Sequence, residues 1–285
     1  MLTAGVLWGI MSIFVEGMKK YGLAPMEVVA VRVWVSSAVL VPLLLVYKPS
    51  LLKIKLRDIW CFAGTGIVSL TMFNYCYFSN ILLTSPGVAA VLMYTSPVFV
   101  MLMSAVLFKE KLTWVKLIAC IGTFVGCAFV SGIGHGSKIS GTGLVLGLVS
   151  GIGYALYSIF GKIATEKGYH SLTVSAYTFL FACIGTAPFT DFGKTSGVIF
   201  QNGIKGFLFA VFGAVVITLI PYYVYTKGLT YIETGTAGVI AAIEVVVAAF
   251  AGYCLFDEDF GIIKIIGVAV VILALAIMNI KKRSS

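Results

Sequence analysis

The stretch LFKEKL at residues 107–112 ends a long apolar run, and LFDEDF at residues 255–260 ends another. The two stretches lie 148 positions apart, counted from glutamate to glutamate (258 minus 110). The same offset aligns Tyr75 with Tyr223 and several further pairs upstream. Self-similarity of this kind predicts that one structural unit occurs twice. If each unit has an odd number of membrane-spanning helices, the two units are inverted, which is typical of secondary transporters.

The repeat continues near the N-terminus at a slightly different offset. Trp8 and Ser12 align with Tyr154 and Ser158 at 146 positions (154 minus 8). The segment between the two halves is rich in Gly and poor in apolar residues, as linkers are. We therefore expect a first repeat over residues 1–131, a linker over 132–140 and a second repeat over 141–285.

The composition is that of an integral membrane protein. Hydrophobic residues make up 60% of the chain and charged residues 11%, with a mean hydropathy of +1.06. Soluble domains carry about 25% charged residues. The net charge of +9 is spread among loops and forms no basic patch, which argues against nucleic-acid binding. The six cysteines are scattered without a CxxC pair, so neither a metal site nor another cofactor is expected.

Ten apolar runs are long enough to cross a bilayer, which requires about 20 residues. Charged segments or Gly and Pro separate them. We thus expect an all-α membrane protein of ten transmembrane helices, arranged as two inverted five-helix repeats. The predicted spans are Leu2–Met18, Met26–Tyr47, Ile59–Leu82, Ser85–Phe108, Trp114–Ser131, Gly141–Ala164, Ser171–Phe189, Ile204–Lys227, Thr234–Phe256 and Ile262–Ile280.

The distribution of Lys and Arg predicts the orientation. With both termini cytoplasmic, thirteen of the 20 basic residues lie on the inner side and six on the outer side, and Arg32 falls within a span. Basic residues accumulate in cytoplasmic loops. The pattern therefore predicts a multi-pass protein of the cell membrane with cytoplasmic N- and C-termini.

Several short motifs occur in the same order as in a known family. They are Trp8-Gly9, Arg32 within AVR, SPVF at 96–99, FKEKL at 108–112 and Glu244 within AIEV. Together they resemble the EamA-type repeats of the drug/metabolite transporter superfamily, over essentially the whole chain. The resemblance implies a ten-helix carrier for small metabolites, amino acids or drugs, often exported, and driven by an ion gradient or by the substrate's own gradient. The family commonly has Pro after the glutamate of the ninth span, whereas this chain has Val245.

Glu244 is the main candidate for a transport residue. It lies about ten residues into its span, near the bilayer midplane where transporter sites occur. A charge at that depth costs at least about 2.5 to 3.5 kcal/mol, so it usually faces a cavity or a partner. At an offset of 148 it aligns with Ser96, beside Pro97, and a proline frees a backbone carbonyl. Glu244 therefore binds substrate or a coupling ion, or it is a paired residue that fixes helix packing.

Arg32 is the second charged candidate. It lies about 9 Å of helix rise inside its span. From there it reaches the outer interface by snorkelling or makes a structural pair, or it contacts an anionic group of the substrate. The second repeat has Thr178 at the equivalent position, so the charge is not shared by the two halves.

Polar and aromatic side chains complete the predicted site. Asn74 and Tyr77 lie in the third span, Tyr222 and Tyr225 in the eighth, and Trp8 in the first. Aromatic faces bind cations, but Tyr and Trp also populate membrane interfaces. Cavity lining and an interfacial belt are equally consistent with these positions.

The stripe of small residues in the sixth span has a simpler interpretation. Gly143, Gly147 and Gly151 recur every four residues on one helix face. Such stripes allow two helices to approach closely. We expect this face to pack against a neighbouring span.

The sequence favours a secondary carrier over other classes. It contains no nucleotide-binding Gly-Lys-Ser/Thr loop, and its histidines lie in predicted loops, which argues against ATP-driven transport and catalysis by this chain. We expect alternating access for amino acids, related compounds or cationic amphipathic drugs, with export as the expected direction. Protons or another ion would supply coupling, and the protein would be a monomer or homodimer in the lipid bilayer. A channel-like facilitator and a non-transporting membrane scaffold remain as alternatives.

Overall fold

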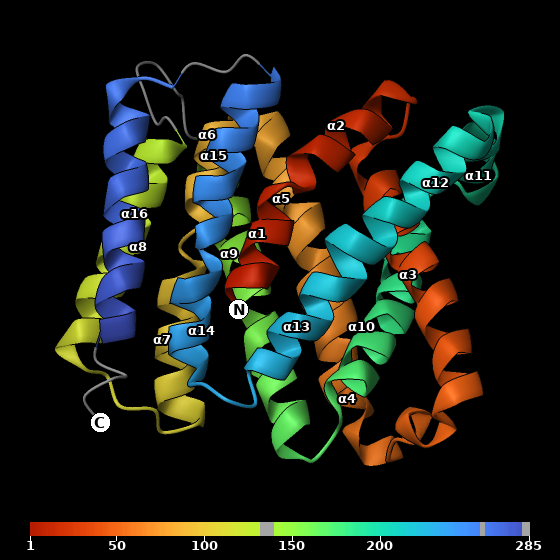
Figure 1. The fold of residues 1–285 in the computed structure, drawn as a ribbon, viewed down its shortest axis with the longest axis horizontal. Coiled ribbons are helices and arrows are strands. Elements are labelled where there is room, and N and C mark those ends of the chain that lie inside the picture. Colours follow the sequence, from red (N-terminus) through yellow and green to blue (C-terminus); the bar gives the residue numbers. More distant parts are fainter. Residues whose placement is uncertain (132–139, 257–259, 281–285) are drawn as a thin grey trace.

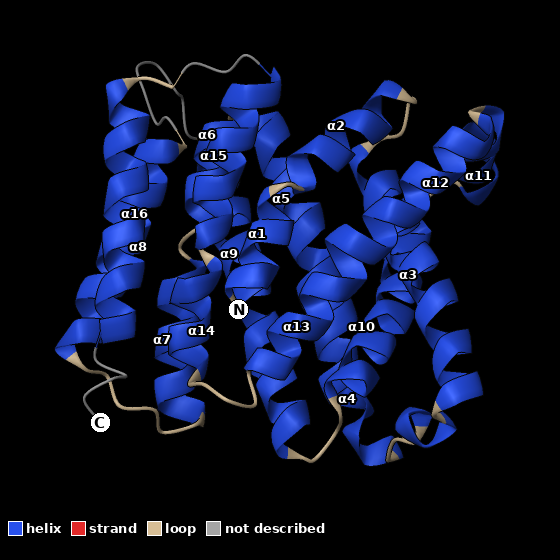
Figure 2. Cartoon of the chain, viewed as in Figure 1, coloured by secondary structure: helices blue, strands red, loops and turns tan. Residues whose placement is uncertain are grey.

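A computed structural model describes residues 1–131, 140–256 and 260–280, so all but the last residue of the predicted linker at 132–140 lies outside the described residues, as does Glu258. Within these ranges the regular structure is helical and contains no strand (Figure 2). The spans and the elements that form them are α1–α2 (Leu2–Gly9, Met11–Lys20), α3 (Pro25–Tyr47), η2–α4–η3–α5 (Leu56–Asp58, Ile59–Ala63, Gly64–Thr71, Met72–Leu83), α6–α7 (Pro86–Met93, Ser96–Leu107), α8 (Trp114–Val130), α9 (Gly141–Glu166), α10–η4 (Ser171–Thr186, Ala187–Phe189), α12–η5–α13 (Gly203–Ala214, Val215–Leu219, Ile220–Gly228), α14–α15 (Thr234–Ala241, Ile243–Phe256) and α16 (Ile262–Ile280).

Within the described residues these elements form ten transmembrane helices, as predicted. Eight are long and apolar enough to cross a bilayer, and Trp114–Val130 and Ile262–Met278 are shorter apolar helices. The shorter pair, α8 and α16, pack against each other at one edge of the bundle (Figure 1). The two halves run in opposite senses, so the fold is two inverted five-helix repeats.

One helix was not predicted. The connection between α10 and α12 contains α11, Phe192–Gln201, at the end of the bundle opposite α8 and α16 (Figure 1). The Asp191 side chain caps it by accepting from the Lys194 amide at 2.9 Å. The Phe192 ring stacks on Trp34 with centroids 3.7 Å apart, which ties α11 to α3. Gly193 and Gly197 lower helix propensity here, which explains why the sequence pattern indicated a loop.

Each half places its first helix against the fourth helix of the other half. A Cβ atom on Gly5 of α1 would lie 2.9 Å from the Ala241 carbonyl oxygen. In the reciprocal contact, a Cβ atom on Gly151 of α9 would lie 2.9 Å from the Leu92 carbonyl oxygen. Such distances are too short for a side chain, so glycine is required at both positions. The packing role predicted for the glycine stripe of α9 is confirmed.

The fourth helix of each half is broken at the same depth. Tyr94 and Thr95 interrupt α6 and α7, and Ala242 interrupts α14 and α15, 148 positions after Tyr94. At the second break the Ala242 and Val245 amides donate to carbonyl oxygens only three residues earlier. Tight turns of this type end a regular helix without proline. The second helix therefore breaks although Val245 replaces the proline that the family commonly has.

The third helix of each half contains a π-helical segment. These segments are η3 in the first half and η5 in the second. The Thr71 hydroxyl donates to the Gly66 carbonyl at 3.0 Å, and the Thr218 hydroxyl donates to the Gly213 carbonyl at 3.1 Å. Both bonds reach five residues back, so a threonine satisfies a carbonyl that the wider turn leaves open. Segments of this kind are often found at functional sites.

The lower end of the bundle in Figure 1 is tied by polar contacts between loops of the two halves. The Asp58 carboxylate accepts from Lys167 Nζ at 2.6 Å and from the Tyr169 hydroxyl at 2.8 Å. The Thr173 hydroxyl donates to the Leu51 carbonyl at 2.6 Å. The hydrogen bond to Asp58 raises the pKa of Lys167 above its ordinary value. These contacts hold the α3–α4 connection against the start of α10.

Candidate functional site

Glu244 lies in the first turn of α15, directly after the helix break. Its side chain is buried, with 8% of the residue exposed. The Tyr154 hydroxyl donates to Oε2 at 3.1 Å, and the Tyr94 hydroxyl makes a second hydrogen bond to the carboxylate. Among the described residues, no cationic side chain forms a salt bridge with it. The N-terminal end of a helix favours negative charge, so α15 and two phenols stabilise this carboxylate without a counter-ion.

A group of rings surrounds this position, which we call the aromatic cluster: Trp8, Tyr154, Tyr157, Tyr222 and Tyr225. The Trp8 ring lies 5.3 Å from both Tyr222 and Tyr225 and 6.4 Å from Tyr154, measured between centroids. Tyr157 meets Tyr222 edge to face at 4.8 Å. The rings come from α1, α9 and α13, and therefore from both halves. Tyr222 and Tyr225 are buried and contact Trp8, which argues against an interfacial belt, and cavity lining stays a prediction for these three residues.

Hydrogen bonds fix part of the aromatic cluster. The Tyr225 and Ser158 hydroxyls lie 2.6 Å apart, and the Tyr157 and Thr226 hydroxyls lie 2.7 Å apart. Tyr222 differs, because within the described chain its hydroxyl has no hydrogen-bond partner, while the charges of Arg32 and Glu244 both act on it. A phenol between two opposite charges can bind either end of a polar ligand.

Arg32 is buried beneath this cluster, with 3% of the residue exposed. Its Nε donates to the Thr218 hydroxyl in η5 at 3.0 Å, and one terminal nitrogen lies 2.9 Å from the Met11 sulfur. The side chain therefore does not extend to the membrane interface, and the snorkelling alternative is wrong. Among the described residues no carboxylate forms a salt bridge with Arg32. Most of its donors are left for another acceptor.

The remaining predicted residues divide into two groups. Tyr77 is close enough for Glu244 to act on its hydroxyl, and its ring lies 6.1 Å from Phe73. Asn74 instead turns back to its own helix and donates to the Leu70 carbonyl at 2.7 Å. Ser96 and Pro97 form the buried first turn of α7, and no hydrogen bond among the described residues joins either to Glu244. Tyr77 thus belongs near the carboxylate, whereas Asn74, Ser96 and Pro97 shape the helices around it.

Three residues of the site were absent from the sequence prediction. Tyr154 and Tyr94 bind the Glu244 carboxylate, and Thr218 binds Arg32. The repeat contained a signal for the first, because Tyr154 aligns with Trp8 and both rings enter the aromatic cluster. Tyr94 lies at the helix break, whose depth the repeat also indicated. Nothing in the sequence pattern pointed to Thr218, since its role depends on the packing of α3 against η5.

The chain is similar to known membrane transporters over most of its length. The model of the EamA-like transporter family matches residues 1–132 and 141–280. The uncharacterized transporter YetK of Bacillus subtilis (strain 168) is 23% identical over 257 residues, covering 88% of this chain and 77% of the relative. An uncharacterized transporter of Helicobacter pylori (strain J99) is 29% identical over 280 residues, covering 95% of this chain and 90% of the relative.

Two further comparisons concern a named exporter and the fold. The threonine/homoserine exporter RhtA of Salmonella typhimurium (strain SL1344) is 26% identical over 211 residues, covering 73% of this chain and 67% of the relative. A solved crystal structure superimposes with a TM-score of 0.78 at 18% identity, covering 99% of this chain and 96% of that one. At this identity the superposition shows the fold alone.

Proposed function

We propose that this chain, which belongs to the EamA-like transporter family, is a secondary carrier. It would export amino acids or related small amines by alternating access. The chain is a multi-pass membrane transporter, and the proposal adds substrate, direction and mechanism. The observation that carries it is the Glu244 carboxylate, buried at the midplane break of α14–α15 without a cationic partner in the described chain. Such a group is expensive in a bilayer unless a ligand or ion uses it.

Two opposite charges favour a zwitterionic substrate. Glu244 and Arg32 act on the same Tyr222 hydroxyl and have no salt bridge among the described residues. The ammonium group of an amino acid would bind Glu244, and its carboxylate would bind the guanidinium, whose fork suits that shape. The aromatic cluster would contact the side chain, and aromatic faces also suit cationic drugs. The RhtA relative, a threonine/homoserine exporter, supports the amino-acid alternative.

Coupling and orientation follow from the same arrangement. We propose that Glu244 exchanges a proton for the substrate ammonium group, so that one site binds either cation. The lower face in Figure 1 would be cytoplasmic, because it collects most of the basic loop residues. Export in the cell membrane would then proceed from this face to the opposite one, with the protein acting as a monomer or homodimer.

Purified protein in liposomes tests the proposal. Thermal-shift screening of amino acids, nucleosides, sugars and quaternary amines would select ligands, and counterflow would measure exchange of each hit. We expect saturable counterflow of an amino acid or amine, dependent on pH. Glu244→Gln should remove both the exchange and its pH dependence, while Glu16→Gln, which alters an exposed pair with Lys19, should change neither.

Several outcomes would contradict this function. Parental exchange and pH dependence in a folded Glu244→Gln protein would exclude Glu244 from the site. Linear, non-saturating flux would indicate a channel, and hits confined to sugars would overturn the substrate class. No exchange with any member of the panel would favour a membrane scaffold.

A further inference from the structure

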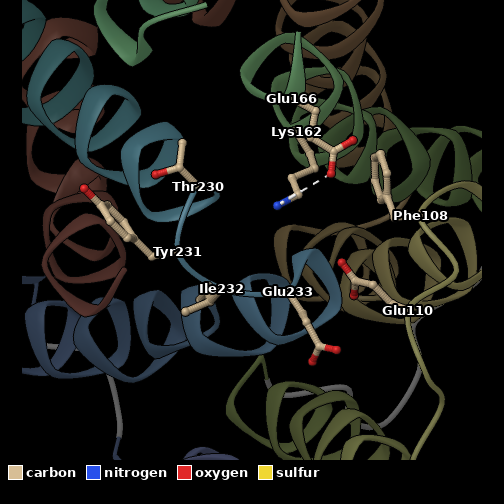
Figure 3. A pocket seen from close by; sticks show the side chains of 8 residues that line it. All are labelled: Phe108, Glu110, Lys162, Glu166, Thr230, Tyr231, Ile232 and Glu233. Carbon is tan, nitrogen blue, oxygen red and sulfur yellow. Dashed lines mark ion pairs between the residues drawn. The ribbon is translucent and has the colours of Figure 1, made fainter. Parts of the chain in front are cut away.

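A second polar region lies at the lower end of the bundle in Figure 1. A cavity of about 320 Å³ opens there between the α7–α8 connection, the last turns of α9 and the α13–α14 connection (Figure 3). It is lined by Phe108, Glu110, Lys162, Glu166, Thr230, Tyr231, Ile232 and Glu233. A cavity of this size and polarity holds several waters. The cavity is therefore large enough to admit water at the seam between the two halves.

Glu110 closes the inner wall of this cavity. Its Oε1 accepts from the Thr234 amide at 2.6 Å, and its Oε2 accepts from the Gly235 amide at 3.1 Å. These amides are the first two of α14, where a helix has donors without intrahelical partners and favours negative charge. The helix thus lacks a side-chain cap of its own and takes one from the opposite half of the molecule. The carboxylate joins α14 to the end of α7.

The backbone beside Glu110 is strained. Lys109 has a φ of 55° and is the one non-glycine residue with positive φ in the described chain. The left-handed conformation costs roughly 1 to 2 kcal/mol for a residue with a side chain. It turns the chain at the end of α7 so that Glu110 faces α14.

Further polar contacts lie at this seam. Lys116 of α8 forms an ion pair with Glu233 at 2.8 Å, which is a second polar contact between the two halves at this seam. The Thr234 hydroxyl is fully buried and has no hydrogen-bond partner in the part of the chain that the structure describes. An unsatisfied buried hydroxyl costs free energy that a rearranged or hydrated seam would recover. The closed arrangement is therefore not the best one for every group at this seam.

We propose that Glu110 is the gate residue of this face: its carboxylate holds α14 against α7 in the closed state, and release of this cap opens the cavity toward the transport site. The inference rests on the proposed carrier function. Its physical basis is that α14 leads, after ten positions (244 minus 234), to Glu244. A movement of α14 away from α7 would therefore open a path along the helix that carries the substrate carboxylate.

Accessibility of a buried cysteine measures this opening. Met101 is buried, and its Cα lies 3.5 Å from a Cβ built on Gly235, so it packs directly above the cap. Met101→Cys would be placed in a background with Cys254 and Cys183 replaced by Ser, in lipid nanodiscs, and labelled with a charged methanethiosulfonate reagent. Glu110→Gln should increase the labelling rate about tenfold, as the loss of a charge-assisted hydrogen bond predicts.

A matched control separates the cap from the charge of the cavity. Glu166 lines the same cavity but pairs with Lys162, whereas the α14 amides of Thr234 and Gly235 donate to Glu110. Glu166→Gln should label at the parental rate. Acceleration in Glu166→Gln equal to that in Glu110→Gln would overturn the proposal, and so would a parental rate in Glu110→Gln.

A second variant removes the donor and keeps the carboxylate. Thr234→Pro deletes one capped amide hydrogen, and the repeat-related helix α6 already begins with Pro86 at this position (234 minus 148). Glu233 has the extended backbone that a residue before proline needs. We expect accelerated labelling here too, and a parental rate would contradict the gate. Labelling needs no substrate, so the two proposals can fail separately. Unchanged labelling rates in the variants would contradict the gate but not the carrier function. Absent counterflow together with the expected labelling rates would contradict the carrier function.

Discussion

The two halves of the molecule share a backbone break at the midplane but differ in what they place there. In the first half the break at Tyr94 and Thr95 is followed by Ser96, and in the second half Ala242 is followed closely by Glu244. Ser96 and Glu244 are equivalent at the 148-residue offset. A broken helix exposes terminal amides at one depth whichever residue follows. The helix break is therefore common to both halves, whereas the carboxylate that follows it occurs in the second half only.

The same division occurs between the second and third helices. Arg32 of α3 binds Thr218 in the π-helical segment of the other half at 3.0 Å. Its equivalent Thr178 in α10 binds Thr65 in the other π-helical segment at 2.7 Å. The cross-half contact is thus kept, but only one member carries charge. The two halves therefore share these contacts but differ in charge at two equivalent positions, Ser96 and Glu244 in one pair and Arg32 and Thr178 in the other.

Exchanging the charge between halves should have the largest effect. The double variant Glu244→Ser with Ser96→Glu moves the carboxylate to the equivalent break. There it lacks the phenol donors, because Tyr154 and Tyr94 align with Trp8 and Ala242. Counterflow in liposomes should fall roughly 100-fold, since hydrogen bonds to a charged group contribute about 1.5 to 3 kcal/mol.

The single variant Ser96→Ala serves as the control for this exchange, because it alters the first-half break without adding charge. It should retain most of the exchange rate. Recovery of parental counterflow by the double variant would show that the two halves are functionally interchangeable, which would contradict the asymmetry.

Replacing the glycines of the two reciprocal helix contacts by leucine should have an intermediate effect on stability, equal in the two halves. Gly5→Leu would meet Ile243 and the Ala241 carbonyl, and Gly151→Leu would meet Thr95 and the Leu92 carbonyl. Overpacking of this type costs about 1 to 3 kcal/mol. Thermal unfolding in detergent should show similar destabilisation for both. Gly141→Ala, which has open space around it, is the control, and a large effect in one half alone would break the structural symmetry.

The smallest effect is expected for Thr178→Ala, at the second pair of equivalent positions. Thr178→Ala removes one neutral hydrogen bond and should destabilise the protein by about 1 kcal/mol. Arg32→Gln removes a charged donor to Thr218 and should cost somewhat more, about 1.5 to 3 kcal/mol. Chemical unfolding would compare them, and counterflow should fall only in Arg32→Gln. Equal loss of counterflow in both variants would contradict a substrate role for Arg32.

Sequence reasoning identified the spans and the duplication because apolar length and repeat spacing are local and cumulative signals. It identified Glu244 because a midplane charge has few harmless explanations. It did not identify α11, whose glycines obscure the helix that Asp191 and Trp34 stabilise. For Arg32 it left snorkelling, a structural pair and substrate contact open, because the burial of that side chain depends on Thr218 and Met11 from distant segments.

The amino-acid sequence is sufficient to predict ten membrane crossings in two inverted halves, and to place Glu244 near the middle of the ninth span. These conclusions depend on composition, length and self-similarity, which do not require contacts. The partners of these residues depend on the three-dimensional packing. Tyr94 and Tyr154 bind the Glu244 carboxylate, and Glu110 of the LFKEKL stretch caps α14 in the other half. Such pairings join residues far apart in the chain, so they are settled by packing and by the need to satisfy buried polar groups.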